Sequence, residues 1–327
     1  MPSEEVISEG SLEKIGEEGS EITNHHKGLR MILEKIDGVE AVGHRVVHGA
    51  EEFTRPVLIN EEVIRQVKEC SSLAPLHNPA NLEGILACLE LLKGVRQIAV
   101  FDTAFHQSIP PKAFIYGLPY EFYEKHKIRK YGFHGTSHHF VAQEAAKRFK
   151  KKLSRVNLIT CHLGNGCSMA AIKNGKSIDT SMGFTPLEGL IMGTRCGDID
   201  PALITHIMHI ENMTAGQVDR LLNKDSGLKG ISGISNDMRE IQAKARQGNK
   251  RAKLAVEIFV YRIRKYISAY MGALGKTDAI VFTAGIGQNQ PALVKYICKG
   301  LFDNLRVKPK VMIIPTNEEL MIARQTY

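Results

Sequence analysis

Two arginines stand where a positive charge needs a partner or a ligand. Arg45 lies inside the apolar run GHRVVHG, and Arg195 lies between two glycines in MGTRCGD. A guanidinium group binds a carboxylate or a phosphate through two parallel hydrogen bonds. Each arginine taken alone is more typical of a structural ion pair. Together with a base, the two indicate a site for an anionic substrate.

A carboxylate and a histidine could complete such a site. Asp102 follows the apolar run QIAVF, and His134 lies in the turn GFHGTSHH. A carboxylate at the end of a strand can act as a base or orient a substrate, and it can equally cap a turn or a helix. Both interpretations of Asp102 stay open at this point.

Two glycine-rich segments follow predicted strands and could hold phosphate groups. They are HLGNG at 162–166 and AGIGQN at 284–289, and we expect both to be turns. Glycine lets backbone N–H groups approach a phosphate closely. Neither segment has the third glycine of a dinucleotide-binding motif. One such segment alone is more often a tight turn than a ligand site, whereas two beside strand ends favour nucleotide binding.

Several common catalytic motifs are excluded by their spacing. The segment GALGKT at 272–277 resembles a phosphate-binding P-loop, but Tyr270 stands where the first glycine of that motif belongs. The pair His206 and His209 and the cysteine–histidine group at 161–167 lack the spacing of a zinc site. No G-x-S-x-G motif of a serine hydrolase is present.

The composition is that of a soluble globular protein of about two domains. The chain has 327 residues, with 43 Lys and Arg against 35 Asp and Glu and a formal net charge of +8. The basic excess falls in surface runs such as 147–152, without a zinc-finger or RNA-binding motif, so no nucleic-acid binding is expected. Six cysteines without a CxxC pair, an acidic start and no long apolar run predict a cytoplasmic protein without a membrane span.

The elements that must position these side chains alternate between strands and helices, which indicates an α/β architecture. Apolar, β-branched runs predict strands at 41–48, 97–103, 156–163, 168–172, 279–285 and 311–315. Helix starts are predicted at three polar caps: Asn60, Asn78 with Pro79, and Ser137. The longest helix is predicted over about 251–274. Its apolar residues, Leu254 and Tyr261 among them, surround most of the axis, so we expect burial on more than one side.

Nine segments together resemble the acetate kinase family, part of the superfamily of acetate and sugar kinases, heat-shock chaperones and actin. They run in the family's order over nearly the whole chain: GHRVVHGAEEF, SSLAPLHNPANLEGI, VFDTAFHQSIP, YGFHGTSHHFVA, CHLGNGCSMAAI, DTSMGFTPLEGLIMGTRCGDIDP, SGLKGISGISNDMREI, FTAGIGQN and IPTNEELMIAR. The resemblance implies a two-domain actin-like (ribonuclease H-like) kinase fold. It places an N-terminal domain at 1–102 with 320–327, and a nucleotide-binding domain at 103–319.

The resemblance also implies a reversible, Mg2+-assisted transfer of the γ-phosphoryl group of ATP to acetate, which gives ADP and acetyl phosphate. Arg45 and Arg195 would hold the carboxylate and the phosphoryl group, and Asp102 would orient the carboxylate or neutralise charge at the site. His134 would stabilise the transition state, and Glu318 would help to hold Mg2+. The implied nucleotide-binding residues are His162, Leu163, Gly164, Asn165, Gly166, Asp237, Met238, Arg239, Gly285, Ile286, Gly287, Gln288 and Asn289.

The sequence departs from the family's pattern at several places. It lacks the first strands of the first domain and their Asn-x-Gly-Ser-Ser-Ser loop, so we expect a truncated N-terminal domain with unpaired sheet edges. The segment 298–311 is shorter than in the family, and Gln288 replaces a common glutamate. Two alternatives therefore remain: an impaired paralogue that binds nucleotide only, and a kinase for propionate or butyrate. The family further implies a homodimer.

Overall fold

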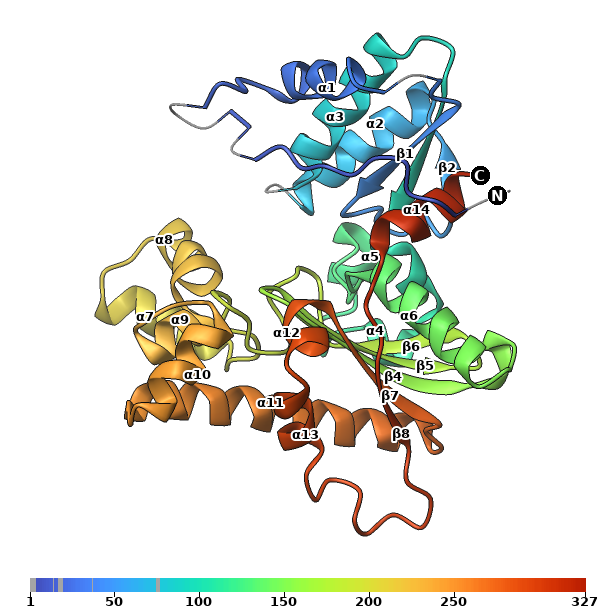
Figure 1. Cartoon of the computed structure of the whole chain (residues 1–327). Helices are drawn as coiled ribbons and strands as arrows, with labels where there is room; N and C mark the ends of the chain where they lie inside the picture. Colours follow the sequence, from blue (N-terminus) through green and yellow to red (C-terminus); the bar gives the residue numbers. More distant parts are fainter. Residues whose placement is uncertain (1–3, 14, 17–19, 37, 75–76) are drawn as a thin grey trace. The chain divides into compact units, whose positions relative to one another are not determined.

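The computed structural model describes residues 4–13, 15–16, 20–36, 38–74 and 77–327. The chain divides into two compact units, shown in Figure 1. Unit 1 comprises Met1–Gln107 and Asn317–Tyr327, and unit 2 comprises Ser108–Thr316. Within the described part of the chain, no helix has the length and apolar character needed to cross a bilayer.

Unit 1 is built on a three-stranded sheet in the order β1-β3-β2. Strands β1 and β3 run parallel, and β2 runs antiparallel to β3. The strands are β1 (Ala41–Val46), β2 (Val57–Leu58) and β3 (Arg96–Phe101). The helices are α1 (His25–Leu33), α2 (Glu61–Glu69), α3 (Asn78–Leu91) and α14 (Glu318–Thr326).

Different helices cover the two faces of this sheet. On one face Val46 packs in an apolar core with Val63 of α2 and Ile85 of α3. On the other face α14 lies so close to β1 that a Cβ atom at Gly43 would collide with Ile322. Residues three apart in a strand point to opposite faces, which is why Val46 and Gly43 meet different helices.

Unit 2 is built on a five-stranded sheet in the order β6-β5-β4-β7-β8. Strands β4, β7 and β8 run parallel, and β5 and β6 are antiparallel additions. The strands are β4 (Asn157–Leu163), β5 (Cys167–Lys173), β6 (Lys176–Thr180), β7 (Ala279–Thr283) and β8 (Lys310–Ile313). Every residue of β7 is buried, as expected of a central strand covered on both faces.

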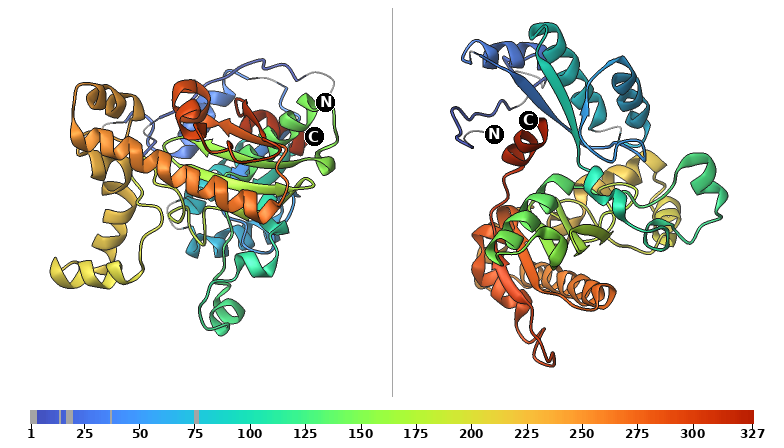
Figure 2. Two further views of the ribbon diagram at one scale, coloured as in Figure 1. Left: turned by 90° about the horizontal axis from the view of Figure 1, so that it is seen from below. Right: turned by 90° about the vertical axis from the view of Figure 1, so that its right-hand side faces the viewer.

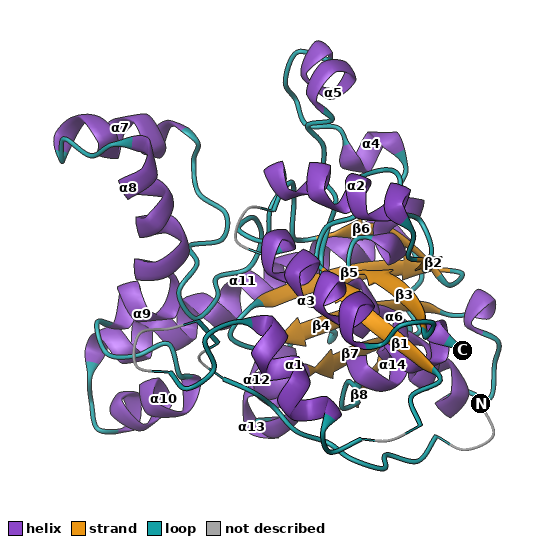
Figure 3. Cartoon of the chain, turned by 90° about the horizontal axis from the view of Figure 1, so that it is seen from above, coloured by secondary structure: helices purple, strands orange, loops and turns teal. Residues whose placement is uncertain are grey.

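Helices cover both faces of the sheet of unit 2. In Figures 1 and 2, α6 lies on one face and the long helix α11 runs along the other. Figure 3 shows α7 and α8 projecting away from the sheet. The helices are α4 (Pro111–Phe114), α5 (Glu121–His126), α6 (Gly135–Arg148), α7 (Ala202–Ile210), α8 (Ala215–Arg220), α9 (Gly227–Ser232), α10 (Met238–Arg246), α11 (Lys250–Leu274), α12 (Ala284–Asn289) and α13 (Pro291–Cys298).

The six predicted strands are confirmed as β1, β3, β4, β5, β7 and β8. Two further strands were not predicted, because β2 has only two residues and β6 has the polar sequence KSIDT. The predicted turn at 284–289 is wrong, since this segment forms the short helix α12. GALGKT is confirmed as the end of a helix, with α11 terminating at Leu274.

The helix starts predicted at Asn60 and at Asn78 with Pro79 are confirmed, although only Asn60 caps its helix, and the start predicted at Ser137 is wrong. The Asn60 side chain accepts a hydrogen bond from the N–H of Val63 at the start of α2. Asn78 is the first residue of α3, as predicted, but its buried side chain does not cap the helix: it accepts from the N–H of His48 and donates to the carbonyl of His48. Ser137 lies inside α6, which begins at Gly135. Both side chains serve tertiary contacts, which a cap pattern in the sequence does not reveal.

The prediction that the longest helix is buried on more than one side is also wrong. Helix α11 buries one stripe of residues three or four apart, including Phe259, Ile263 and Ile267. Leu254 and Tyr261 are 48% and 62% exposed. The helix therefore covers the sheet with a single face.

Candidate active site

In unit 1 the fold brings Arg45 and Asp102 together at the carboxyl ends of two parallel strands. Arg45 is near the end of β1, and Asp102 directly follows β3, where its N–H donates to the carbonyl of Val46 at 3.0 Å. Parallel neighbours end at the same edge of a sheet, which is where α/β proteins commonly bind ligands. The two residues are 57 positions apart in the sequence, so only strand pairing makes them neighbours.

The two side chains form a bidentate ion pair. Arg45 Nε lies 3.1 Å from Asp102 Oδ1, and Arg45 Nη2 lies 2.7 Å from Asp102 Oδ2. The Asp102 carboxylate is buried, whereas the Arg45 side chain is 43% exposed and so can also meet a ligand. The ion pair that the sequence favoured for Arg45 alone is confirmed.

Glu318 at the start of α14 completes this group. Its Oε2 lies 3.6 Å from Arg45 Nε. Burial raises the pKa of Glu318, and the charge of Arg45 partly opposes that rise. The pKa of Arg45 is itself raised, chiefly by the charge of Asp102. One cation thus faces two carboxylates, and a bound cation could offset the excess negative charge.

In unit 2 the predicted phosphate-binding segment is confirmed as a tight turn. Residues 164–166 connect the antiparallel strands β4 and β5, and the Gly164 N–H donates to the Gly166 carbonyl at 3.0 Å. Asn165 is held from two sides: its carbonyl accepts from the Gly193 N–H at 2.9 Å, and its Oδ1 accepts from Asn236 Nδ2 at 2.9 Å. The turn therefore has one fixed conformation.

A cavity of about 630 Å³ opens beside this turn. Its lining residues come from the turn, from α10 with the segment before it, and from α12 with the residue after it. They are Gly164, Asn165, Asn236, Asp237, Met238, Arg239, Gln242, Arg246, Gly285, Ile286, Asn289 and Gln290. Three segments that are distant in the sequence thus meet around one space large enough for a small-molecule ligand.

Most of the residues implied for nucleotide binding line this cavity, and some do not. Leu163 of β4 and Gly287 of α12 are buried and do not line it, and His162, Gly166 and Gln288 also lie outside the lining.

Sequence reasoning missed four lining residues: Asn236, Gln242, Arg246 and Gln290. The spacing of Arg239, Gln242 and Arg246 by three and four residues puts them on one face of α10, a signal that was available in the sequence.

Asp237 and Arg239 have a structural task at the start of α10. The Asp237 carboxylate caps the helix by accepting from the Arg239 N–H at 2.8 Å, and it also accepts hydrogen bonds from Nε and Nη2 of the Arg239 guanidinium. These bonds lower the pKa of Asp237. The pair thereby fixes the helix start that forms one wall of the cavity.

Arg195 is the half-buried cation of this region. Within the described ranges no carboxylate lies at ion-pair distance from it, so the structural ion pair that the sequence favoured for this residue is wrong. Its Nη1 donates instead to the Pro186 carbonyl at 3.3 Å, and burial lowers its pKa. A partly desolvated cation without a counter-charge is suited to bind an anion.

His134 and Arg195 both reach the glycine turn. A Cβ atom at Gly166 would lie 3.5 Å from His134 Nε2 and 3.6 Å from Arg195 Nη1. The His134 ring stacks on the His162 ring with 4.1 Å between centroids. His134 has a φ of 54°, a left-handed conformation that is uncommon for residues other than glycine and costs free energy. The fold thus holds this imidazole beside the turn against a local backbone preference.

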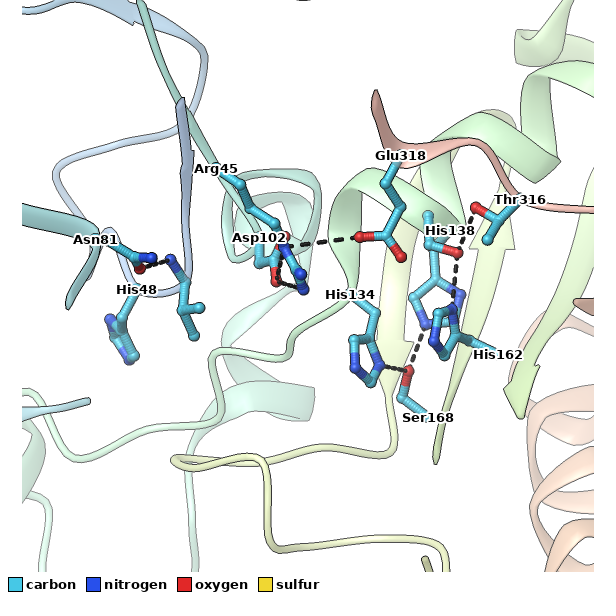
Figure 4. A network of polar contacts seen from close by, with 12 residues as sticks. Arg45, His48, Asn81, Asp102, His134, His138, His162, Ser168, Thr316 and Glu318 are labelled. Atoms are coloured by element: carbon cyan, nitrogen blue, oxygen red, sulfur yellow. Dashed lines mark hydrogen bonds and ion pairs between the residues drawn. The ribbon is translucent and has the colours of Figure 1, made fainter. Parts of the chain in front are cut away.

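Hydrogen bonds fix both imidazole rings, as Figure 4 shows. His134 Nδ1 is 2.8 Å from Ser168 Oγ, and His162 Nδ1 is 2.8 Å from Ser137 Oγ. Ser137, which was predicted to cap α6, also donates to Thr316 Oγ1 at 2.9 Å. Across the described residues, no cluster of three or more His, Cys, Asp or Glu side chains is arranged to hold a metal ion.

Comparison with known proteins places this site in a family. The Acetokinase family model matches residues 4–324. The acetate kinases of Halothermothrix orenii and Dictyoglomus thermophilum are each 48% identical to this chain, over all of it and 94% of the relative. Each alignment extends over 373 positions, more than the 327 residues of this chain, so these relatives contain internal segments that the chain lacks.

Solved structures agree with the fold. The crystal structure of Porphyromonas gingivalis acetate kinase matches with a TM-score of 0.88 at 43% identity, over 94% of this chain and 85% of that one. A propionate kinase from Francisella tularensis matches with a TM-score of 0.89 at 44% identity, over the same shares. These matches confirm the predicted actin-like kinase fold. By sequence over nearly its whole length and by its fold, the chain belongs to the Acetokinase family.

Proposed function

We propose that this protein is an acetate kinase, which reversibly transfers the γ-phosphoryl group of ATP to acetate and forms ADP and acetyl phosphate. The observation that carries this proposal is Arg195, a half-buried cation without a carboxylate partner in the described chain, next to His134 and the turn 164–166. The adjacent cavity of about 630 Å³ is the proposed site of the nucleoside. Unit 2, which contains both, is the proposed nucleotide-binding domain.

The reaction is a direct in-line displacement. An acetate oxygen forms a bond to the γ-phosphorus while the bond from that phosphorus to the bridging oxygen of ADP breaks. Negative charge spreads over the three equatorial oxygens in the transition state, so fixed cations and N–H donors supply most of the catalysis. Arg195 and His134 are the proposed stabilising groups. Arg45, held by Asp102, is proposed to bind and orient the acetate carboxylate.

The residues present fit an enzyme that uses Mg2+. This ion commonly takes only one or two protein carboxylates, together with water and substrate phosphates, so a full protein cage is not needed. Glu318 is the carboxylate proposed to hold it, and its pKa is raised chiefly by burial, with the negative charge of Asp102 adding to the rise. When bound, Mg2+ neutralises charge on the phosphates.

Acetate is the proposed acceptor because the relatives from Halothermothrix orenii and Dictyoglomus thermophilum, each 48% identical to this chain, are acetate kinases. Propionate is the second candidate, since the Francisella tularensis propionate kinase is as similar in structure as the acetate kinases. One methylene group changes discrimination by only about 1 to 3 kcal/mol. Butyrate is a further candidate acceptor, and the protein could alternatively bind nucleotide without catalysing the reaction. The following assay separates these alternatives.

The assay mixes the protein with MgATP, hydroxylamine and acetate, propionate or butyrate, and measures the acyl hydroxamate. We expect acetohydroxamate as the main product, and a loss of about 100-fold or more in Arg195→Ala. Arg155→Ala, an exposed arginine in unit 2, is the matched control and should keep full activity. Thermal stabilisation by ATP without any hydroxamate would identify a protein that only binds nucleotide. Faster turnover of propionate or butyrate would reassign the acceptor.

A homodimer is proposed on the basis of α7. This helix has the largely apolar sequence ALITHIMHI, and none of its residues is buried. Ile210 is 58% exposed, and Leu203 and Ile204 are also exposed. A second copy of the chain is the proposed cover. Ile204→Asp should convert a dimer to a monomer in light scattering, and a monomeric parent protein would contradict the proposal.

The cytoplasm is the proposed location. All six cysteines are free thiols, as expected in a reducing compartment. The proposed partners are ATP or ADP and a short-chain carboxylate, with no nucleic acid or membrane.

A further inference from the structure

We propose that Thr160, His138 and Ser168 form a directional chain of hydrogen bonds that makes Nε2 of His134 a permanent N–H donor. The three are positioning residues, because they act on the reaction through His134. The inferred proton position follows from the structure alone, whereas its effect on turnover rests on the proposed function.

The chain consists of three short hydrogen bonds, visible in part in Figure 4. Thr160 Oγ1 is 2.7 Å from His138 Nδ1, His138 Nε2 is 2.8 Å from Ser168 Oγ, and Ser168 Oγ is 2.8 Å from His134 Nδ1. Thr160, His138 and Ser168 are each fully buried. These residues come from β4, α6 and β5, so the core of unit 2 fixes their relative positions.

Thr160 sets the direction of the chain. A hydroxyl group has one proton to donate, and leaving a buried donor unpaired is costly. Among the residues that the structure describes, the Thr160 hydroxyl has His138 Nδ1 as its one hydrogen-bond partner. The Thr160 proton must therefore go to His138 Nδ1. This nitrogen is then an acceptor, so neutral His138 has its own proton on Nε2.

The next two bonds follow from the first. His138 Nε2 donates to Ser168 Oγ, which uses the oxygen as an acceptor. The Ser168 proton is then available only for His134 Nδ1, its other partner in the described chain. Because His134 Nδ1 accepts a hydrogen bond, the proton of the neutral His134 ring stands on Nε2. The opposite direction would leave the Thr160 proton without an acceptor.

The nitrogen that receives this proton is the one that faces the glycine turn. His134 Nε2 lies 3.5 Å from the position of a Cβ atom at Gly166, and Arg195 Nη1 lies 3.6 Å from the same position. The neutral His134 ring can therefore donate a hydrogen bond from Nε2 to a phosphoryl oxygen, and the ring does not have to be protonated. Preorganised donors of this kind lower the barrier because they need not reorient during the reaction.

The first test reads the proton position without any need for activity. Histidine labelled with 15N is incorporated into the nucleotide-free protein, and spectra are recorded at about pH 8, where ordinary imidazoles are neutral. The His134 signals are assigned by their loss in His134→Gln. We expect a protonated Nε2 and a hydrogen-bonded, unprotonated Nδ1. A proton on Nδ1 of His134 in the parent protein would overturn the proposal.

Two variants test whether the chain is responsible. Ser168→Ala removes the link next to His134, and Thr160→Val removes the hydroxyl group that sets the direction while preserving side-chain shape. We expect the Nδ1 signal to lose its hydrogen-bond shift in Ser168→Ala, and the two tautomers to mix in Thr160→Val. Ser181→Ala is the matched control: this serine is equally buried and accepts from the Met169 N–H, outside the chain. Unchanged His134 signals in both variants would overturn the proposal.

Kinetics then separate this inference from the proposed function. If both are right, Ser168→Ala lowers kcat by about 10- to 100-fold, the range seen when the group that orients a metal-binding histidine is removed. The KM for ATP should stay unchanged, because the cavity does not involve Ser168. A drop in stability with kcat intact would show a merely structural role and overturn the positioning role. A parent protein with the expected tautomer but no kinase activity would refute the proposed function and leave the proton position established.

Discussion

Asp102 binds the Arg45 guanidinium edge-on, through Nε at 3.1 Å and Nη2 at 2.7 Å. A second pair has the same two-bond geometry: Arg65 donates to Glu62 through Nε at 3.0 Å and Nη2 at 2.6 Å on the surface of α2. Only the first pair has a buried carboxylate. Because the two ion pairs have the same geometry, a mutation in each one shows how much of the effect on activity comes from the location of Asp102 and how much from loss of an ion pair.

Asp102→Asn should lower kcat/KM for acetate by about 100-fold, because the amide holds Arg45 less firmly and no longer balances its charge. It should also lower the free energy of unfolding by about 2 kcal/mol, the scale of a hydrogen bond to a charged group. Hydroxamate kinetics and urea unfolding measure the two effects. Glu62→Gln, which alters the exposed pair, should leave turnover as it is. An equal loss of kcat/KM in Asp102→Asn and Glu62→Gln would refute a special role for Asp102.

Gly193→Ala should disturb the nucleotide site, because the added Cβ would collide with Asn165 Oδ1 in the glycine turn. We expect weaker ATP binding by calorimetry and a lower melting temperature. Gly216→Ala is the control, since its Cβ would meet nothing within 4 Å on the short helix α8. Alanine there should be neutral or stabilise by up to about 1 kcal/mol. Unaltered ATP affinity in Gly193→Ala would show that the position of Asn165 does not matter for binding.

Glu318→Gln should raise the Mg2+ concentration required for half-maximal activity, because the amide is a weaker ligand for a hard cation than a carboxylate. Glu319→Gln, one position along α14 and exposed, provides the matched control and should keep the parent Mg2+ dependence. The measurement is a Mg2+ titration of the activity at a fixed ATP concentration, and addition of a chelator should abolish the activity. Identical titrations for the two variants would exclude Glu318 as the metal-binding carboxylate.

His48 should make unit 1 sensitive to acid. Its ring is fully buried, its Nδ1 accepts from the Ala50 N–H, and burial lowers its pKa from 6.5 to about 4. Because the folded-state pKa is below the unfolded one, the stabilisation is complete above pH 6.5 and is lost as the pH falls through about 4. The loss should approach about 3 kcal/mol, at about 1.4 kcal/mol per pKa unit.

The matching variant is His48→Asn, whose side-chain oxygen can still accept from Ala50. Urea unfolding between pH 4 and 7 should show a flatter pH dependence for this variant than for the parent protein. The comparison between the two is needed because burial also lowers the pKa of His139 to about 4, with the same sign. Parallel curves for parent and variant would refute the assignment to His48.

Local pattern predicted the strands and the groups available for chemistry, because alternation, apolar runs and glycine content are properties of short segments. The helix caps show where this kind of reasoning ends. Asn78 and Ser137 have the residue type of a cap, yet Asn78 bonds to the backbone of His48, 30 positions away, and Ser137 bonds to Thr316, 179 positions away. Buried polar groups need a hydrogen-bond partner, so these side chains bind distant buried groups and not the nearby helix end. Which groups are buried depends on the whole fold.

The sequence by itself determined the family, the α/β class and the identity of the groups that can bind a phosphate or a carboxylate. The tertiary structure decided which of these groups form ion pairs and hydrogen bonds with one another. It paired Arg45 with Asp102 and left Arg195 without a carboxylate in the described chain. It also brought α10 into the cavity wall and joined His134 to Thr160 through two intervening side chains. The physical reason is that charge balance and hydrogen-bond direction depend on distances between segments, which the order of residues alone does not set.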